Sequence, residues 1–150
     1  MSNWIQIDPN ADVATTLDVA FITAARKRAP AGVDPVQVAI NDTVARIRAA
    51  CSTGNAMDAD TTRIPRSLKG LALRMIGRWV KTKIPNVQLT QDERDAGRDD
   101  NSFLLRISDD KIRFEMPDTP AGTAEMQHGD TVQAVCVPRR QTGRGRQSGL

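Results

Sequence analysis

The segment of residues 34–51 constrains the fold more than any other part of the chain. Asp34 can cap the start of a helix, and Pro35 suits the first helical position, where its missing N–H costs nothing. Apolar residues then recur at spacings of four, four, three and four, which is the period of one helix face. These residues are Val36, Ile40, Val44, Ile47 and Cys51. The segment therefore predicts an amphipathic helix, with Cys51 as a buried apolar residue.

Periodicity and end signals predict three more helices. One spans about residues 16–28 and is broken by the Pro-Ala-Gly that follows. Another runs over about residues 65–83, opens on a proline and has a broad apolar face, as is typical of a central core helix. The last begins at a capping box over residues 90–93 and continues to about Ile107.

Composition favours packed helices over a β-sandwich. Aromatic residues make up only 3% of the 150 residues, and tyrosine is absent, so the core has to be built from aliphatic side chains. Alternating polar and apolar residues predict a short strand over 111–116, and 131–137 is a second candidate. We expect a mainly α fold, a bundle of about four helices with one or two short strands. Residues 1–116 would form the helical domain, and 117–150 an extended C-terminal arm rich in Pro, Gly and Arg.

The charge distribution separates the body from the arm. The chain has 21 basic and 18 acidic residues, and residues 118–150 contain four arginines and three acids. The first 117 residues therefore hold 17 basic and 15 acidic groups, which is not the basic field of a DNA-binding domain. The last thirteen residues carry all four of those arginines and no acid.

No pattern in the chain points to catalysis. A glycine-rich phosphate loop, a nucleophile elbow and a dinucleotide fingerprint are all missing from the sequence. His128, the one histidine, lies in the arm and is expected to be solvated. Residues 58–60 begin like a calcium loop, but Arg63 and Lys69 stand where that loop needs Gly and Glu. We expect a protein that is not an enzyme and has no metal or cofactor.

The acidic residues between 92 and 110 are interleaved with Arg94, Arg98 and Arg106. This pattern favours a solvated, salt-bridged helix over a metal or acid–base site. The polarity of residues 92–100 places the first two turns at a surface or an interface. Cys51 and Cys136 are too few for a disulfide framework or a zinc cluster.

Three short patterns occur in a particular order along the chain: Val-Ala-Arg-Ile-Arg at 44–48, Ile-Pro-Arg-Ser-Leu-Lys-Gly-Leu-Ala at 64–72, and Leu-Leu-Arg-Ile-Ser-Asp-Asp-Lys-Ile at 104–112. With the order of the helices, they resemble the head–tail connector (adaptor) proteins of tailed bacteriophages over about residues 12–116. The chain departs from that family at Asp109-Asp110, where such relatives carry a glycine.

The resemblance implies a structural protein of the virion neck, made in the host bacterial cytoplasm. It would form a homo-oligomeric ring, commonly of twelve copies, stacked under the portal protein. The ring would extend the channel through which viral DNA passes and would present a platform for a stopper or tail-completion protein.

In this interpretation the arm binds the portal or a neighbouring subunit. Residues 131–137 could add as a strand to a partner's sheet, and the arginines could pair with carboxylates. The residues expected to bind are Val132, Val135, Val137, Arg139, Arg140, Arg144 and Arg146.

Three alternatives remain open. The chain could be a small nucleic-acid-binding protein whose arginine-rich arm enters a minor groove or contacts phosphates. It could be a helical module of another assembly, or the arm could only aid solubility. A membrane partner is not expected, because no apolar run reaches the length of a span and residues 1–4 lack the features of a secretory signal.

Overall fold

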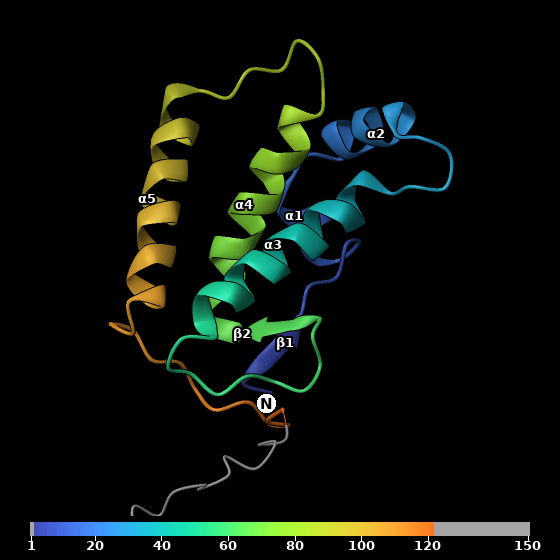
Figure 1. The fold of residues 1–150 in the computed structure, drawn as a ribbon. Helices are drawn as coiled ribbons and strands as arrows, with labels where there is room; N and C mark the ends of the chain where they lie inside the picture. The colour runs from blue at the N-terminus through green and yellow to red at the C-terminus, as the bar shows by residue number, and fades with distance from the viewer. Residues whose placement is uncertain (1, 122–150) are drawn as a thin grey trace, which may run out of the picture.

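The structure, a computed structural model, describes residues 2–121 and is mainly helical, as the sequence predicts (Figure 1). Five α-helices, a single 3-10 turn and a two-stranded antiparallel sheet make up this part of the chain. In chain order they are β1 (Trp4–Gln6), α1 (Asp12–Thr16), α2 (Val19–Arg28), α3 (Pro35–Cys51), β2 (Arg63–Pro65), η1 (Arg66–Leu68), α4 (Lys69–Thr82) and α5 (Gln91–Ser108).

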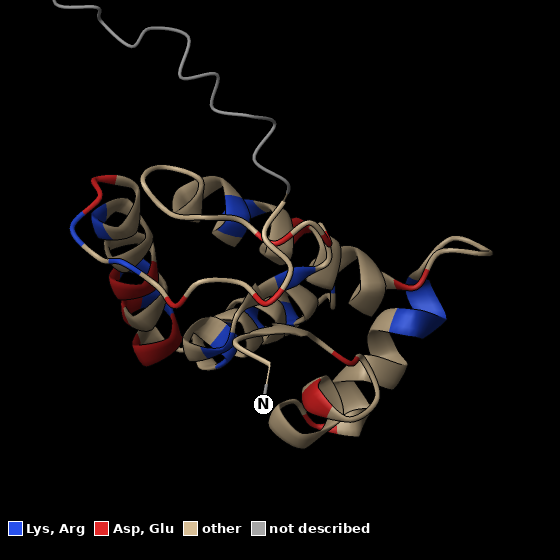
Figure 2. Ribbon diagram, turned by 90° about the horizontal axis from the view of Figure 1, so that it is seen from below, with Lys and Arg blue, Asp and Glu red and all other residues tan. Residues whose placement is uncertain are grey.

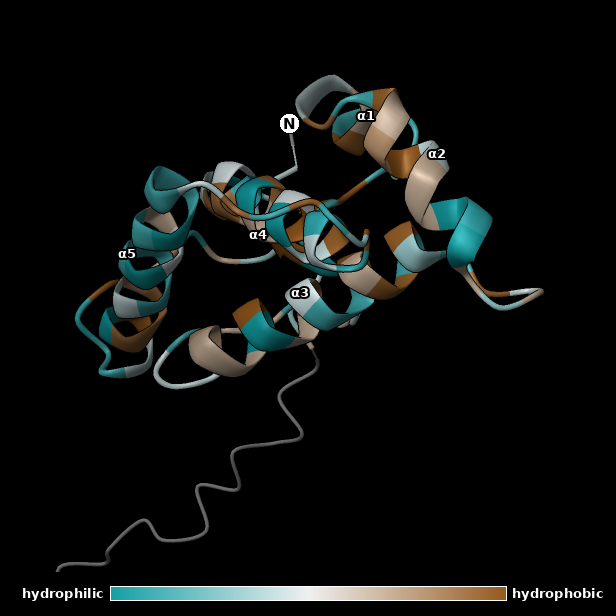
Figure 3. Ribbon diagram, turned by 90° about the horizontal axis from the view of Figure 1, so that it is seen from above, coloured by the Kyte–Doolittle hydropathy of each residue, from teal (hydrophilic) through white to brown (hydrophobic). Residues whose placement is uncertain are grey.

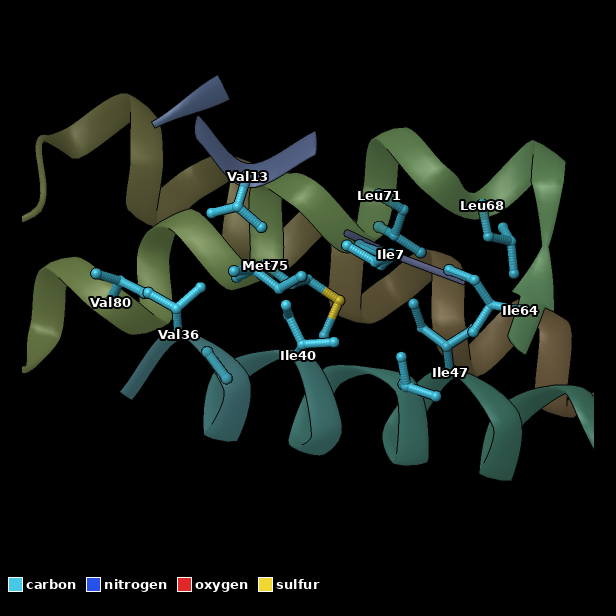
Figure 4. Close-up of a cluster of buried hydrophobic side chains, with 14 of the residues drawn as sticks. Ile7, Val13, Val36, Ile40, Ile47, Ile64, Leu68, Leu71, Met75 and Val80 are labelled. Carbon is cyan, nitrogen blue, oxygen red and sulfur yellow. The ribbon is translucent and has the colours of Figure 1, made fainter. Parts of the chain in front are cut away.

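The core lies around α4, which contacts α1, α2, α3 and α5. Figure 4 shows Ile40 and Ile47 of α3 pointing toward Leu71 and Met75 of α4. Ile64 of β2 closes the same apolar layer and is fully buried. The predicted role of the 65–83 segment as a central core helix is therefore confirmed.

Helix α3 matches its prediction closely. The side chain of Asp34 accepts a hydrogen bond from the backbone N–H of Val36, and Pro35 opens the helix. Cys51, the last residue of α3, is completely buried, and burial raises the pKa of its thiol to about 11. Gly54 then turns the chain with a φ of 79°, and the side chain of Asp110 fills the place where a Cβ would stand.

The predicted start of the 16–28 helix is wrong. The chain forms two helices there, α1 and α2, separated at Leu17 and Asp18. Leu17 is extended and buried, and the side chain of Asp18 accepts from the N–H of Ala20 as the cap of α2. A capping aspartate competes with helix continuation by offering its own acceptor to the backbone.

The predicted start of the 65–83 helix is also wrong by four residues. Ile64 and Pro65 pair with Ile5 and Trp4 in the β1–β2 sheet, so the helix proper begins only at Lys69. Trp4, the partner of Pro65 in this sheet, is almost fully buried, with 1% of its surface exposed.

The predicted strand over 111–116 is not formed. Ile112 and Phe114 alternate in burial with their neighbours and pack on the core, which accounts for the period of two. The backbone N–H of Phe114 donates to the Asn55 side chain rather than to another strand. The second predicted strand, 131–137, lies outside the described residues. Within residues 2–121, no helix combines the length and the apolar character required to cross a membrane.

Candidate interaction surface

Helix α5 is held to the body by a small apolar contact and by an ion cluster around the buried carboxylate of Asp100. Leu104 and Ile107 enter the core, while Asp100, 5% exposed, lies on the same face one turn earlier. Its carboxylate accepts hydrogen bonds from the guanidinium groups of Arg74, at 2.8 Å, and Arg78 of α4. The cluster fixes the side on which α5 faces the body.

Burial by itself would raise the pKa of Asp100 and is the largest single effect on it. Hydrogen bonds and charge from Arg74 and Arg78 together outweigh burial, so the pKa is lowered and the group stays ionised. The expectation that this acid is solvated is therefore wrong. Asp100 continues the line of Ala96, Leu104 and Ile107, and that position on the apolar stripe was the signal of its burial.

The exposed face of α5 carries opposite charges on its two flanks. Asp92, Asp95 and Asp99, spaced three and four apart, form one line, which we call the acidic edge. Arg94 and Arg98, four apart, lie on the flank that faces α3. Figure 3 shows the outer side of α5 as mostly hydrophilic, and Figure 2 shows that both signs of charge occur along it.

A groove of about 440 Å³ lies between α5, α3 and α4 on the arginine side. We call it the arginine groove. Arg46 of α3, Arg94 and Arg98 line it with exposed side chains, and Met75, Arg78 and Trp79 line it with less exposed ones. Two carboxylates, those of Asp42 and Glu93, also border the groove. Its lining is therefore basic but not uniformly so.

Arg46, Arg94 and Arg98 are only lightly engaged, whereas Arg78 is paired with the buried Asp100. The Nη2 of Arg46 donates to Asn101 Oδ1 at 3.0 Å, a neutral partner. Arg98 is 3.2 Å from the carboxylate of Asp95, in a pair that is largely exposed on both sides. Exposed pairs of this kind contribute little to stability, so they yield readily to a better partner. Arg94 has no carboxylate partner within residues 2–121.

A second surface is formed where the C-terminal part of the described chain returns to the sheet. We call residues 115–121 the C-terminal strap. The N–H of Ala59 donates to the carbonyl of Thr119 at 2.8 Å, and the N–H of Ala121 donates to the carbonyl of Met57 at 2.7 Å. The carboxylate of Asp118 accepts from Ser2 and from the N–H of Asn3, at 3.1 Å. The first residues of the expected arm are thus bound to the body.

The strap also contacts a group of residues centred on Arg48. The guanidinium of Arg48 donates to the carbonyls of Asp58, Asp60 and Arg63 at 2.8–3.0 Å, and it lies 5.7 Å from the centre of the Trp4 ring. The indole N–H of Trp4 in turn donates to the carbonyl of Glu115 at 3.1 Å. Four distant segments are joined at this point.

Thr119 is the strap residue whose loss is most easily measured. Its hydroxyl donates to Oδ1 of Asp58 at 2.9 Å, and Asp58 is fully buried with no partner for Oδ2 within the described residues. We expect Thr119→Val to lower the free energy of unfolding by about 2 kcal/mol, because a buried carboxylate loses a donor. Urea unfolding measures this, with Thr61→Val as an exposed control. Equal effects of the two substitutions would contradict a stabilising strap.

The residues that the sequence singles out for partner binding fall outside residues 2–121. Val132, Val135 and Val137 lie beyond the described chain, and so do the four arginines from Arg139 to Arg146. The structure instead brings Arg46 of α3 together with the arginine flank of α5, which sequence reasoning did not connect. Comparisons of the chain with protein-family models, curated proteins and solved structures find no match.

Proposed function

We propose that the protein is a head–tail connector (adaptor) of a tailed bacteriophage, a structural component of the virion neck. In this proposal the helical body forms a ring under the portal protein, viral DNA passes through its channel, and a stopper or tail-completion protein binds below. The C-terminal arm fastens the ring to the portal or to a neighbouring subunit. The role is structural, with no catalytic step.

The C-terminal strap is the observation that carries this proposal. It pins Ala121 to the sheet end of the body, away from the loop between α4 and α5 (Figure 1). The 29 residues that follow could span about 100 Å if fully extended, which exceeds the dimensions of one such body. A long basic segment that starts from a fixed point suits attachment to a separate, acidic partner, and many copies in a ring would multiply the affinity.

Truncation after Ala121 tests the attachment. Cutting earlier, before Asp118, would also remove Thr119 from the buried Asp58 and so weaken the body itself. We expect the 1–121 chain to keep the circular dichroism spectrum and melting temperature of the full chain but to lose its binding to purified portal rings. Sedimentation of each chain mixed with portal rings measures binding.

A full-length variant in which the last four arginines are changed to glutamine is the matched control for charge. It should bind portal rings more weakly and lose the salt dependence of the wild-type chain, because each removed charge can pair with a portal carboxylate. Undiminished binding by the 1–121 chain would contradict the proposal, and so would a wild-type chain that ignores portal rings.

A small nucleic-acid-binding protein is the second candidate, and the arginine groove is the observation that favours it. This function predicts duplex binding that weakens steeply with salt, with a slope of about 3–4 if each arginine of the arm neutralises one phosphate. A gel-shift series over salt concentration separates the two functions. Strong duplex binding together with indifference to portal rings would favour the nucleic-acid binder.

A further inference from the structure

We propose that α5 forms the contact between neighbouring copies of this chain: the acidic edge of one copy docks into the arginine groove of the next. This inference rests on the ring of the proposed function and assigns the surface that would close it. The occupant of the groove is therefore a second copy, presenting the side chains of Asp92, Asp95 and Asp99.

The first reason is charge complementarity. Asp92 and Asp99 are exposed and have no cationic partner within residues 2–121, and the same part of the chain offers no carboxylate to Arg46 or Arg94. Apart from the exposed Asp95–Arg98 pair, each chain thus carries acidic and basic side chains on α5 and α3 that the described residues leave without a charged partner. Placing them against each other would satisfy both, and complementary potentials of this kind set the orientation of an interface.

The second reason is that the two surfaces lie on different flanks of α5. Arg94, Gly97, Arg98 and Asn101 border the arginine groove. Asp92 and Asp99 border hollows on the other flank, beside α4. One copy can therefore use both surfaces at once. Two acidic edges, or two arginine grooves, would repel each other, so the contact runs head to tail, which generates rings when the rotation closes.

Space and an apolar side chain are both present. The groove's 440 Å³ lies within the range of pockets that hold small ligands, which leaves room for several short side chains. Leu105 follows Arg94, Arg98 and Asn101 along the same line of α5 and is 65% exposed. Leu105 lies one turn beyond Asn101, outside the lining of the groove, and can add an apolar contact at the edge of the interface.

A nucleic acid fits the groove less well than a second copy does. The acidic edge lies on the same helix, with Asp95 and Asp99 each adjacent in sequence to a groove arginine. A duplex broad enough to reach Arg94 and Arg98 would bring its phosphates toward these carboxylates. Asp42 and Glu93 add two more negative groups at the border of the groove. The mixture of signs favours a protein surface that carries the reverse mixture.

Charge-swap variants of the full-length chain test the inference. Asp95→Lys with Asp99→Lys makes the edge basic, and Arg94→Glu with Arg98→Glu makes the groove acidic. Each double variant alone should associate roughly 100-fold more weakly than the wild type, because attraction becomes repulsion. An equimolar mixture of the two should recover association, since the basic edge of one fits the acidic groove of the other. Sedimentation velocity over a concentration series measures all four samples.

Salt provides an independent readout. Raising the ionic strength from about 0.01 M to about 1 M shortens the Debye length from about 30 Å to about 3 Å, so wild-type association should weaken over this range. Lys27→Glu with Arg66→Glu is the matched control for the acidic groove: it makes the same change of net charge as Arg94→Glu with Arg98→Glu, at exposed positions outside α5, and should associate as the wild type does. All altered side chains are exposed, so circular dichroism should stay unchanged.

The outcomes separate this inference from the proposed function. A wild-type chain that stays monomeric up to about 1 mM at low salt would overturn the α5 contact, and so would a mixture that fails to recover. If Arg94→Glu with Arg98→Glu abolishes duplex binding and leaves association intact, the groove binds nucleic acid instead. The connector function is tested separately, by comparing portal binding of the full-length chain with that of the 1–121 chain. That comparison does not depend on the α5 contact.

Discussion

Replacing Asp100 with asparagine is expected to lower the free energy of unfolding by about 2–4 kcal/mol. The carboxylate is 5% exposed and receives hydrogen bonds from two guanidinium groups, and its loss would leave the charge of Arg78, whose side chain is 16% exposed, uncompensated. Urea unfolding measures the loss. Asp99→Asn, the exposed neighbour on the same helix, should change stability by no more than about 0.5 kcal/mol.

The same residue predicts a pH dependence. In the folded protein the pKa of Asp100 lies below the unfolded value of about 3.9, so its stabilisation is complete above about pH 5 and is lost as the pH falls through the lowered folded value. The difference in stability between the wild type and Asp100→Asn should therefore narrow on acidification. A difference that stays constant down to about pH 2 would contradict an ionised, paired Asp100.

Replacing Trp4 with alanine is expected to have the largest effect of any single substitution here, about 4 kcal/mol. The ring is 1% exposed, packs under the Arg48 guanidinium and donates its N–H to the Glu115 carbonyl. Its removal combines the cavity cost of a large buried side chain with the loss of a hydrogen bond and a cation–π contact. Domains of this size are stable by about 5–15 kcal/mol, so most of the margin would be lost.

Trp4→Phe is the control that separates these contributions. It keeps a smaller aromatic ring beside Arg48 and loses the N–H and part of the buried ring volume, so the cost should be about 2 kcal/mol, well below that of alanine. Thermal unfolding followed by circular dichroism measures both variants, and Trp79 remains as a fluorophore in each. If Trp4→Ala lowers the free energy of unfolding by less than about 1 kcal/mol, the sheet end of the body contributes little to stability.

Local signals were enough to predict the parts of the fold that local physics decides. Asp34-Pro35 and the apolar stripe set α3, and Thr90 with Glu93 forms the predicted capping box of α5. Both features depend only on residues within one or two helical turns, so local sequence alone was sufficient to predict them.

Elements that depend on distant partners could not be predicted in this way. β1 and β2 are three residues each and pair across nearly sixty positions, so neither has a pattern long enough to stand out. Residues 111–116 have a strand-like period but pair with no strand within residues 2–121, and the side chain of Asn55 accepts a hydrogen bond from the N–H of Phe114. In both cases the availability of a partner strand, rather than the β-propensity of the segment, decided whether a strand formed.

The candidate interaction surface shows the same limit. The sequence places residues 92–100 at a surface or an interface, and the exposure of their charged edge agrees with this. It does not reveal that Arg46, almost fifty residues earlier, borders the same groove as Arg94 and Arg98. The proposed binding residues of the arm, from Val132 to Arg146, lie beyond the described chain and stay a prediction.

The junction at Arg48 has a consequence for the order of events during synthesis. The N–H of Trp4 needs the carbonyl of Glu115, and Asp58 needs the hydroxyl of Thr119, so the sheet end cannot close until the ribosome has made the strap. At about 5–20 residues per second, the interval between Pro65 and Ala121 is roughly 3–11 s. During that time the nascent chain contains both β1 and β2 but lacks the strap residues that contact Trp4 and Asp58. During synthesis the strap can therefore bind only after α3, α4 and α5 have been made.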